Sequence, residues 1–209
     1  MRVRITFAKQ GALRYIGNLD LHKIWERSIR RAKLPLAYSQ GYHPQPKINL
    51  AAALPLGFSS SAEVMDIWLN EDVDDIVSTL QAHIPPGLTI MEANQVDDRE
   101  PSLQSQVIAS EYQVEITETP QVGEAGFGSG LNEKIASILE AESIPRVRRK
   151  KPYDLRPLIE ELTAPDEHHI HMRLTAREGA TGRPEEVLDA MGIPLEDTRT
   201  ERTKLLFKE

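Results

Sequence analysis

Basic side chains recur on one face of the segment 18–33, in which Asn18 is predicted to cap a helix. Four of them stand at helical positions i, i+4, i+7 and i+8, opposite the apolar residues: Lys23, Arg27, Arg30 and Arg31. Glu26 is the only anion near them, so ordinary pairing along the helix does not neutralise the stripe. Because Lys and Arg release counterions when they neutralise phosphates, the stripe predicts contact with a nucleic-acid backbone. The alternative is a solvated helix face opposite the acidic middle region of the same fold.

A second group of chemically useful side chains lies in the loop 38–47, whose sequence is YSQGYHPQPK. Aromatic rings offer stacking platforms for unpaired bases. We expect Tyr42 and His43 to stack on or hydrogen-bond a base, while Lys47 and the preceding Arg14 bind phosphate. Two alternatives stay open. The loop is a proline-stiffened turn whose tyrosines cover the sheet, or His43 is a general base that acts on a ribose hydroxyl.

The third basic group is the run 146–151, RVRRKK, which Tyr153 and Arg156 follow. Its cations repeat the composition of the first half and predict further nucleic-acid contacts from Arg148, Arg149, Lys150 and Lys151. The alternative is that the run is solvated and binds no ligand. The basic groups would flank one groove if the two halves of the chain faced each other.

Two other patterns predict no site. In a strand, His169 and His171 share a face while His168 points away, and neither a Cys nor a spaced carboxylate completes a metal site. The glycine-rich stretch 126–130, GFGSG, lacks the Lys of a phosphate-binding loop and is interpreted as a flexible connection. We therefore expect no metal and no cofactor.

The elements that must position these side chains follow from hydrophobic periodicity. In the first half the order is strand, helix, a strand-rich middle, helix and strand. The predicted strands are 2–7, 48–54, 63–69 and 88–96, the second and third joined by the serine-rich 58–62, and the helices begin near 18 and 73. Trp25 and Ile29 lie on the apolar face of the first helix, so we expect both to be buried.

The second half repeats this order. It predicts strands at 107–117, 170–174 and 198–207, helices at 131–139 and 184–191, and an extended or mixed middle between residues 146 and 162. The sequence therefore predicts an α+β protein of two tandem βαββαβ ferredoxin-like units, with helices packed on one face of each antiparallel sheet. We expect the units to span residues 1–97 and 106–209, separated by a polar linker.

Composition excludes several classes of protein. The 209 residues are 40% hydrophobic and 27% charged, which excludes a disordered or low-complexity chain. There is no Cys, so the chain holds no disulfide, thiolate zinc site or cysteine-ligated iron–sulfur cluster. The N-terminus lacks the apolar core of a signal peptide, and no uncharged, Pro-free apolar run approaches the roughly 20 residues of a membrane helix. We expect a soluble, cytoplasmic protein.

Charge is strongly segregated along the chain. Residues 1–50 hold 10 Lys/Arg against Asp20 and Glu26, a net charge of +8. Residues 51–145 hold 17 Asp/Glu against Arg99 and Lys134, a net charge of −15. Potentials act locally because salt screens them over about 10 Å. The chain is therefore expected to present one basic and one acidic surface.

The stretch 7–69 resembles a bacterial family of unknown function, the radical SAM-associated or radical SAM-linked proteins. It is similar in four parts: RYIGNLDL, the basic helix, the YSQGYHPQPK loop and the LPLG turn. Gly17 and Asn18 stand where the family pattern has a Ser-His pair, so no essential histidine is carried over there. Members occur alone, fused to, or encoded beside cobalamin-binding radical SAM proteins. The resemblance implies an accessory role, with the iron–sulfur cluster held by the partner.

The leading hypothesis is a non-catalytic accessory protein that binds RNA and presents it to a radical SAM partner. One alternative is a metal-independent RNA-processing enzyme that uses His43 as base. Another is a protein–protein adaptor whose acidic middle region docks a basic partner without nucleic acid. The charge segregation supports the adaptor almost as well as the RNA binder.

Overall fold

Two units make up the part of the chain that the computed structural model describes, residues 1–117 and 130–208. Unit 1 comprises residues 1–107 together with the C-terminal residues from 207, and unit 2 comprises residues 108–206. Both combine helices with mostly antiparallel strands. The prediction of a mixed α+β protein is confirmed. Among the described residues, every helix is too short or too polar to cross a membrane.

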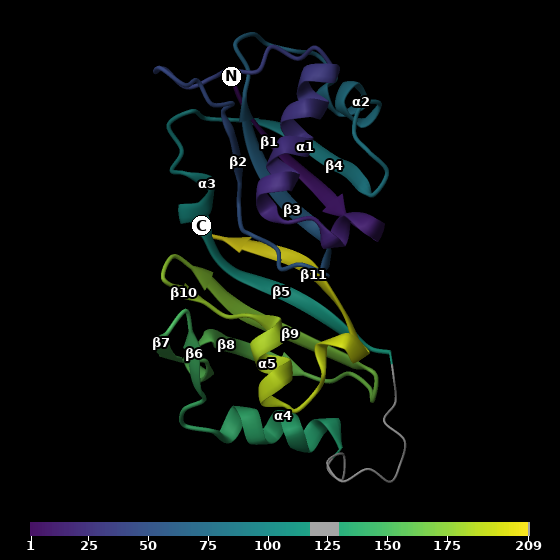
Figure 1. Ribbon diagram of the computed structural model, residues 1–209, viewed down its shortest axis with the longest axis vertical. Helices are drawn as coiled ribbons and strands as arrows, with labels where there is room; N and C mark the ends of the chain where they lie inside the picture. Colours follow the sequence, from purple (N-terminus) through teal and green to yellow (C-terminus); the bar gives the residue numbers. More distant parts are fainter. Residues whose placement is uncertain (118–129, 209) are drawn as a thin grey trace. The chain divides into compact units, whose positions relative to one another are not determined.

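Unit 1 begins with a strand because apolar residues alternate from Val3 to Phe7, and all of them face inward. Its strands pair antiparallel in the order β2-β3-β1-β4 (Figure 1). The elements in chain order are β1 (Arg2–Lys9), η1 (Gly11–Tyr15), α1 (Asn18–Arg31), β2 (Ile48–Leu50), β3 (Ser59–Trp68), α2 (Ile76–Gln81), β4 (Leu88–Val96) and α3 (Leu103–Gln106).

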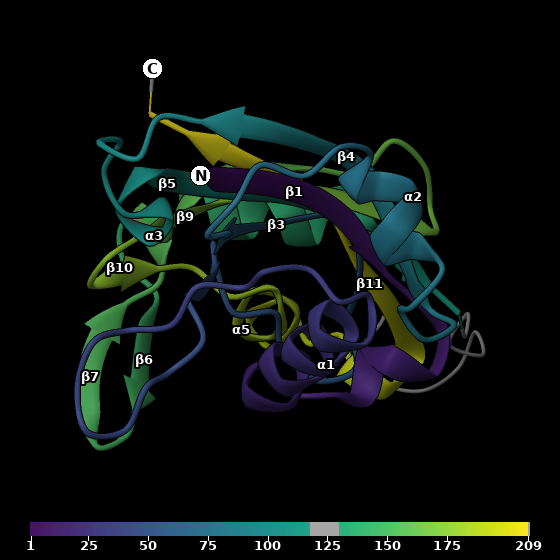
Figure 2. The same cartoon turned by 90° about the horizontal axis from the view of Figure 1, so that it is seen from above.

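The core of unit 1 lies between its sheet and its two longer helices. Trp25 and Ile29 of α1 are fully buried, as predicted, and belong to the same apolar cluster as Leu80 of α2 and Ile5 of β1. Both helices therefore pack on the face of the sheet that carries the inward side chains of β1. Figure 2 shows α1 on one side of β1 and β3.

The opposite face of this sheet buries charge. Arg2 is only 2% exposed and donates to the carboxylate of the fully buried Asp66, which also accepts from Arg4 at 2.9 Å. The Arg2 guanidinium donates in addition to the carbonyls of Glu100 and Pro101, at 2.9 and 3.0 Å. The segment that follows β4 is thereby tied to the start of β1. The polar side of β1 is paired rather than solvated.

Unit 2 repeats the order of paired strands with additions. Its strands are neighbours in the order β8-β9-β5-β11, and β10 pairs with the end of β9. The elements are β5 (Val107–Ile116), α4 (Leu131–Glu140), β6 (Pro145–Arg148), β7 (Lys151–Asp154), η2 (Arg156–Leu158), β8 (Ile159–Thr163), β9 (His169–Arg177), β10 (Ala180–Thr181), α5 (Pro184–Ala190), η3 (Leu195–Asp197) and β11 (Thr198–Phe207).

Three local predictions are wrong. Asn18 does not cap α1: the N-cap is Gly17, and Asn18 is the first helical residue. The serine-rich stretch is not a connection between two strands, because Ser59–Ala62 are the first residues of β3 and Ser60 pairs with Lys9 of β1. The strand predicted over 48–54 ends at Leu50. The glycine-rich residues 126–129 lie outside the described residues.

Candidate nucleic-acid interface

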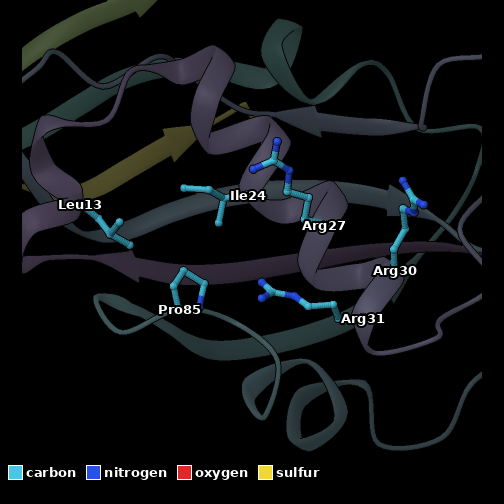
Figure 3. A pocket seen from close by; sticks show the side chains of 6 residues that line it. All are labelled: Leu13, Ile24, Arg27, Arg30, Arg31 and Pro85. Carbon is cyan, nitrogen blue, oxygen red and sulfur yellow. The ribbon is translucent and has the colours of Figure 1, made fainter.

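Three of the four predicted cations of α1 surround one pocket of unit 1. The pocket has a volume of about 630 Å³ and is lined by Leu13, Ile24, Arg27, Arg30, Arg31 and Pro85 (Figure 3). Leu13 comes from η1 and Pro85 from the turn before β4, while the other side chains come from α1. In Figure 3 the Arg31 side chain extends toward Pro85, and Leu13 and Ile24 lie at the other end of the pocket. We call this site the α1 pocket.

The cations of α1 differ in how much of their charge is paired. Lys23 lies 3.3 Å from the Asp20 carboxylate, and Arg30 lies 3.9 Å from Glu26. The expectation of an unneutralised stripe is therefore wrong at these two positions. Arg31 donates to the hydroxyl of Ser28, and Arg27 has no carboxylate partner among the described residues. Among the described residues, no carboxylate is paired with Arg27 or Arg31, the two other exposed cations of the α1 pocket.

The two segments that form the wall of the α1 pocket opposite α1 are joined by a backbone hydrogen bond. The amide of Gln10, just before η1, donates to the carbonyl of Gly87 at 2.8 Å. Gly87 has φ +95°, and a Cβ there would lie 2.7 Å from the carbonyl oxygen of Gln10 and 3.1 Å from Leu13. Only glycine permits this approach. The Pro85–Gly87 turn and η1 therefore form one rigid wall opposite α1.

The aromatic loop of residues 38–47 is closed at its base. An isolated bridge joins Tyr38 to Pro46, and the amide of Ser39 donates to the carbonyl of Gln45 at 2.8 Å. Tyr42 at its tip is 96% exposed and meets the ring of His43 edge-on at 5.2 Å. Tyr42 therefore covers no part of the sheet. Both rings are free to contact a ligand.

Arg14 and Lys47 lie apart from the α1 pocket. The Arg14 guanidinium stacks on the ring of Tyr15, 4.7 Å from its centroid, and donates to the Tyr15 hydroxyl. Lys47 is exposed, and its backbone joins residue 37 to residue 68 beside the aromatic loop. Both residues were predicted to bind phosphate beside the aromatic loop, and neither lines the α1 pocket.

Part of the positive charge of residues 1–50 is not available to a ligand. Arg2 and Arg4 are paired with Asp66. Lys9 is 1% exposed and donates to the carbonyl of Ile16 at 3.0 Å. The net charge of this segment therefore overstates its basic surface. The accessible part is concentrated on α1 and near the aromatic loop.

The basic run 146–151 lies in a β-hairpin, within the region that the sequence predicts to be extended or mixed. Strands β6 and β7 pair from Pro145 to Asp154, and the two turn residues, Arg149 and Lys150, both have positive φ, at 47° and 66°. Such a two-residue turn matches the twist of a hairpin. Arg146 is paired with Asp189 at 3.0 Å. The cations that remain exposed at the tip are Arg148, Arg149, Lys150 and Lys151.

A second pocket, of about 720 Å³, lies beside this hairpin within unit 2. Its lining includes Arg148, Arg149 and Lys151 together with Tyr153 and both residues of β10. Burial of the ring is the largest cause that raises the pKa of Tyr153, so its hydroxyl stays protonated near neutral pH. Cations and a ring with a neutral hydroxyl thus occur together in unit 2, as the sequence suggested.

The histidines of β9 face different partners. His169 is hydrogen-bonded to Asp166 at 2.8 Å, whose pKa is lowered first by the amide of His168 and then by the His169 side chain. His171 is exposed and lies opposite Gln113 of β5. The described residues contain no group of three or more His, Asp or Glu that could hold a metal ion.

A family model described as an uncharacterized protein conserved in bacteria, DUF2344, matches residues 2–184. The matched residues include α1, the aromatic loop and the basic hairpin. No curated protein matches the chain.

Proposed function

We propose that this chain, which belongs to the DUF2344 family of bacterial proteins, is a non-catalytic accessory protein that binds RNA. Arg27, Arg30 and Arg31 contact phosphates, and Tyr42 and His43 contact an unpaired base. Lys23 of α1 adds a further phosphate contact, as do Arg14 and Lys47, which lie elsewhere in unit 1. The hairpin cations Arg148, Arg149, Lys150 and Lys151 add contacts in unit 2.

The observation that carries this proposal is the α1 pocket. Three arginines of one helix line it, and all three are exposed. Two of them, Arg27 and Arg31, have no carboxylate partner in the part of the chain that the structure describes. Guanidinium groups are the side chains best suited to phosphate, because their donors match its oxygens in pairs. The fully exposed Tyr42 supports RNA in particular, since single-stranded bases stack on aromatic rings.

The proposed partner is a radical SAM enzyme, of the cobalamin-binding kind that the sequence resemblance implies. The chain contains no Cys and therefore cannot ligate the iron–sulfur cluster of such an enzyme itself. In this proposal the chain holds the RNA and the partner supplies the chemistry. Co-purification of the two proteins, followed by sequencing of the bound RNA, tests this part.

Both units are also proposed to be ferredoxin-like folds in tandem. The support is the equivalent order of their neighbouring strands, β2-β3-β1-β4 and β8-β9-β5-β11, each with a helix after the first and third strand of that unit's βαββαβ series. The β6–β7 hairpin and β10 are then insertions in the second unit. Such insertions supply the second basic surface.

The decisive experiment measures RNA affinity against salt concentration. Replacing Arg27, Arg30 and Arg31 by Ala leaves the fold intact, because all three side chains are exposed. If they contact three phosphates, the slope of log K against log salt falls by about 2–3 units. Tyr42→Ala weakens binding by about 1–3 kcal/mol without changing that slope, since stacking releases no counterions. A wild-type protein with no RNA affinity at low salt would refute the proposal.

His43 separates the accessory protein from the processing enzyme. His43→Ala reduces the affinity of an accessory binder, whereas a nuclease with this base keeps its affinity and loses turnover. The edge-on contact with Tyr42 favours a recognition role, because it holds the His43 ring beside the proposed stacking surface. RNA cleavage that persists at wild-type rate in His43→Ala excludes His43 as the base.

A further inference from the structure

The α1 pocket combines two kinds of surface that a bare phosphate does not need. Arg27 and Arg31 supply charge, but Leu13, Ile24 and Pro85 supply no hydrogen-bonding side chain at all. An anion that filled only the charged end would leave the apolar end against water. A ligand that satisfies both ends carries a negative charge and a flat or apolar body.

The dimensions fit one small molecule. At about 630 Å³, the α1 pocket lies in the range of 300–1,000 Å³ that is typical of small-ligand sites. Figure 3 shows Arg31 reaching toward Pro85 while Leu13 and Ile24 lie beyond, so the charged and apolar parts follow one another along the pocket. A phosphate at Arg31 would leave its attached sugar and base over the apolar end.

The pocket is also formed in advance. The Gln10–Gly87 hydrogen bond holds the apolar wall in place, and Gly87 packs so closely that a Cβ there would lie 3.1 Å from Leu13. On the other side, Trp25 and Ile29 anchor α1 in the core, which fixes the positions from which the arginines project. A rigid site loses little entropy when it binds, so even a single nucleotide can gain measurable affinity there.

From these observations we infer that the α1 pocket holds one nucleotide unit, with its phosphate at Arg27 and Arg31 and its base against Leu13, Ile24 and Pro85. This inference rests on the proposed function and deepens it, because it assigns the pocket one unpaired nucleotide of the RNA rather than a stretch of backbone. Free nucleoside monophosphates share this chemistry and are the other source of such a ligand.

The first experiment is a calorimetric titration of the full chain at low salt with three probes: inorganic phosphate, ribose 5-phosphate and uridine or adenosine 5′-monophosphate. The nucleotide is expected to bind at least about tenfold more tightly than the other two, since only the nucleotide covers the apolar end. Equal affinity for all three probes overturns the inference.

The second experiment compares exposed cations that line the pocket with a nearby one that does not. Arg27→Ala and Arg31→Ala each lower the nucleotide affinity by about tenfold, the loss expected for one charge-assisted hydrogen bond. Lys33→Ala is the control, because Lys33 is an exposed cation just after α1 that does not line the pocket and has no part in the proposed RNA contacts. Loss of affinity in Lys33→Ala as large as in Arg27→Ala overturns the inference in favour of general electrostatic attraction.

Competition with RNA distinguishes the two sources of the nucleotide. Displacement of a labelled single-stranded RNA by the monophosphate supports the pocket as an RNA-binding element. RNA binding that depends on Arg27 without any monophosphate binding overturns the single-nucleotide inference and leaves the proposed function intact. Monophosphate binding without RNA binding overturns the proposed function and assigns the pocket to free nucleotides.

Discussion

Trp25 is the residue whose packing fixes the position of α1. It is fully buried and meets Phe7 of β1 edge-on, with ring centroids 4.8 Å apart and planes inclined at 69°. Edge-on aromatic pairs add stability beyond the area they bury. The indole Nε1, however, has no hydrogen-bond partner among the described residues. The buried ring therefore stabilises the core, while burial of its unpaired N–H costs desolvation free energy.

This difference predicts a large and a small loss of stability for two substitutions of Trp25. Trp25→Ala lowers the free energy of unfolding by about 3–5 kcal/mol, because it leaves a cavity beneath α1. Trp25→Phe costs clearly less, since it keeps an aromatic ring against Phe7 and removes the unpaired N–H. Chemical denaturation of both variants checks this prediction. A nearly neutral Trp25→Ala would mean that the apolar face of α1 is not part of the core.

At the scale of elements, the turn that joins α2 to β4 depends on a single glycine. Gly87 and Gly57 have similar positive φ, +95° and +88°, but only Gly87 is in close contact: a Cβ at Gly57 would meet no atom within 4 Å. Comparing substitutions at these two glycines therefore distinguishes the cost of a strained backbone conformation from the cost of a steric clash. The same turn supplies one wall of the α1 pocket.

Gly57→Ala is expected to cost about 1–2 kcal/mol from its left-handed conformation alone. Gly87→Ala carries the same strain, and in addition its Cβ would lie 2.7 Å from the carbonyl oxygen of Gln10, so its melting temperature falls further. Thermal denaturation of the two variants side by side gives the comparison. Equal melting temperatures would show that the turn moves away from η1 without cost.

Asp154 closes the base of the basic hairpin. Its carboxylate accepts from the amide of Ile144, just before β6, at 2.8 Å and from the amide of Arg156, just after β7, at 3.0 Å. The hydrogen bond from Ile144 is the largest cause that lowers the pKa of Asp154. The ionised carboxylate is thus the form that the fold prefers, and it holds both ends of the hairpin together.

The sign of this shift gives a pH prediction. A carboxyl group whose pKa is lowered on folding stabilises the fold above its ordinary pKa of 3.8, and this stabilisation is lost as pH falls through the lower folded value. Asp154→Asn is therefore less stable than wild type at neutral pH, and the difference shrinks below about pH 4. Melting temperatures measured from neutral to acidic pH test this. A constant difference across that range would contradict it.

At the scale of the molecule, both units carry accessible charge. The basic surfaces are the α1 pocket and the tip of the β6–β7 hairpin, while Asp72 and Asp74 are exposed acids before α2. Asp75 belongs to the same acidic run, but it caps α2 through the amide of Ser78 and has φ 47°. Asp72 and Asp74 are therefore better suited than Asp75 for testing the adaptor hypothesis without disturbing a helix.

The hairpin and the acidic run provide a matched test of where RNA binds. Replacing the four hairpin cations by Ala lowers the slope of log K against log salt by about 3 units if all contact single-stranded RNA. The control, Asp72→Asn with Asp74→Asn, leaves the slope unchanged. A hairpin variant with the wild-type slope would remove unit 2 from the interface. Loss of a protein partner in the acidic variant, without any RNA binding by the wild type, would establish the adaptor instead.

Sequence by itself determined the elements whose periodicity is local. The strands 88–96 and 198–207 have the predicted bounds, and Trp25 and Ile29 are buried as the helical spacing of α1 requires. These features depend on residues within one or two turns or one strand of each other. The period of the apolar residues indicates which face of a helix or strand packs against the core. The cations of α1 were identified for the same reason.

Only the tertiary structure decided which charges remain available and what lies beside them. The alternation of β1 predicts that Arg2 is solvated, yet it forms a buried ion pair with Asp66, 64 positions away in the chain. Pro85 and Leu13 are distant from Arg31 in the chain, and the pairing of β1 with β4 brings them to the same pocket. Partners of a charge and the walls of a pocket depend on contacts between remote segments. No local pattern specifies those contacts, because the sheet order that creates them is a property of the whole unit.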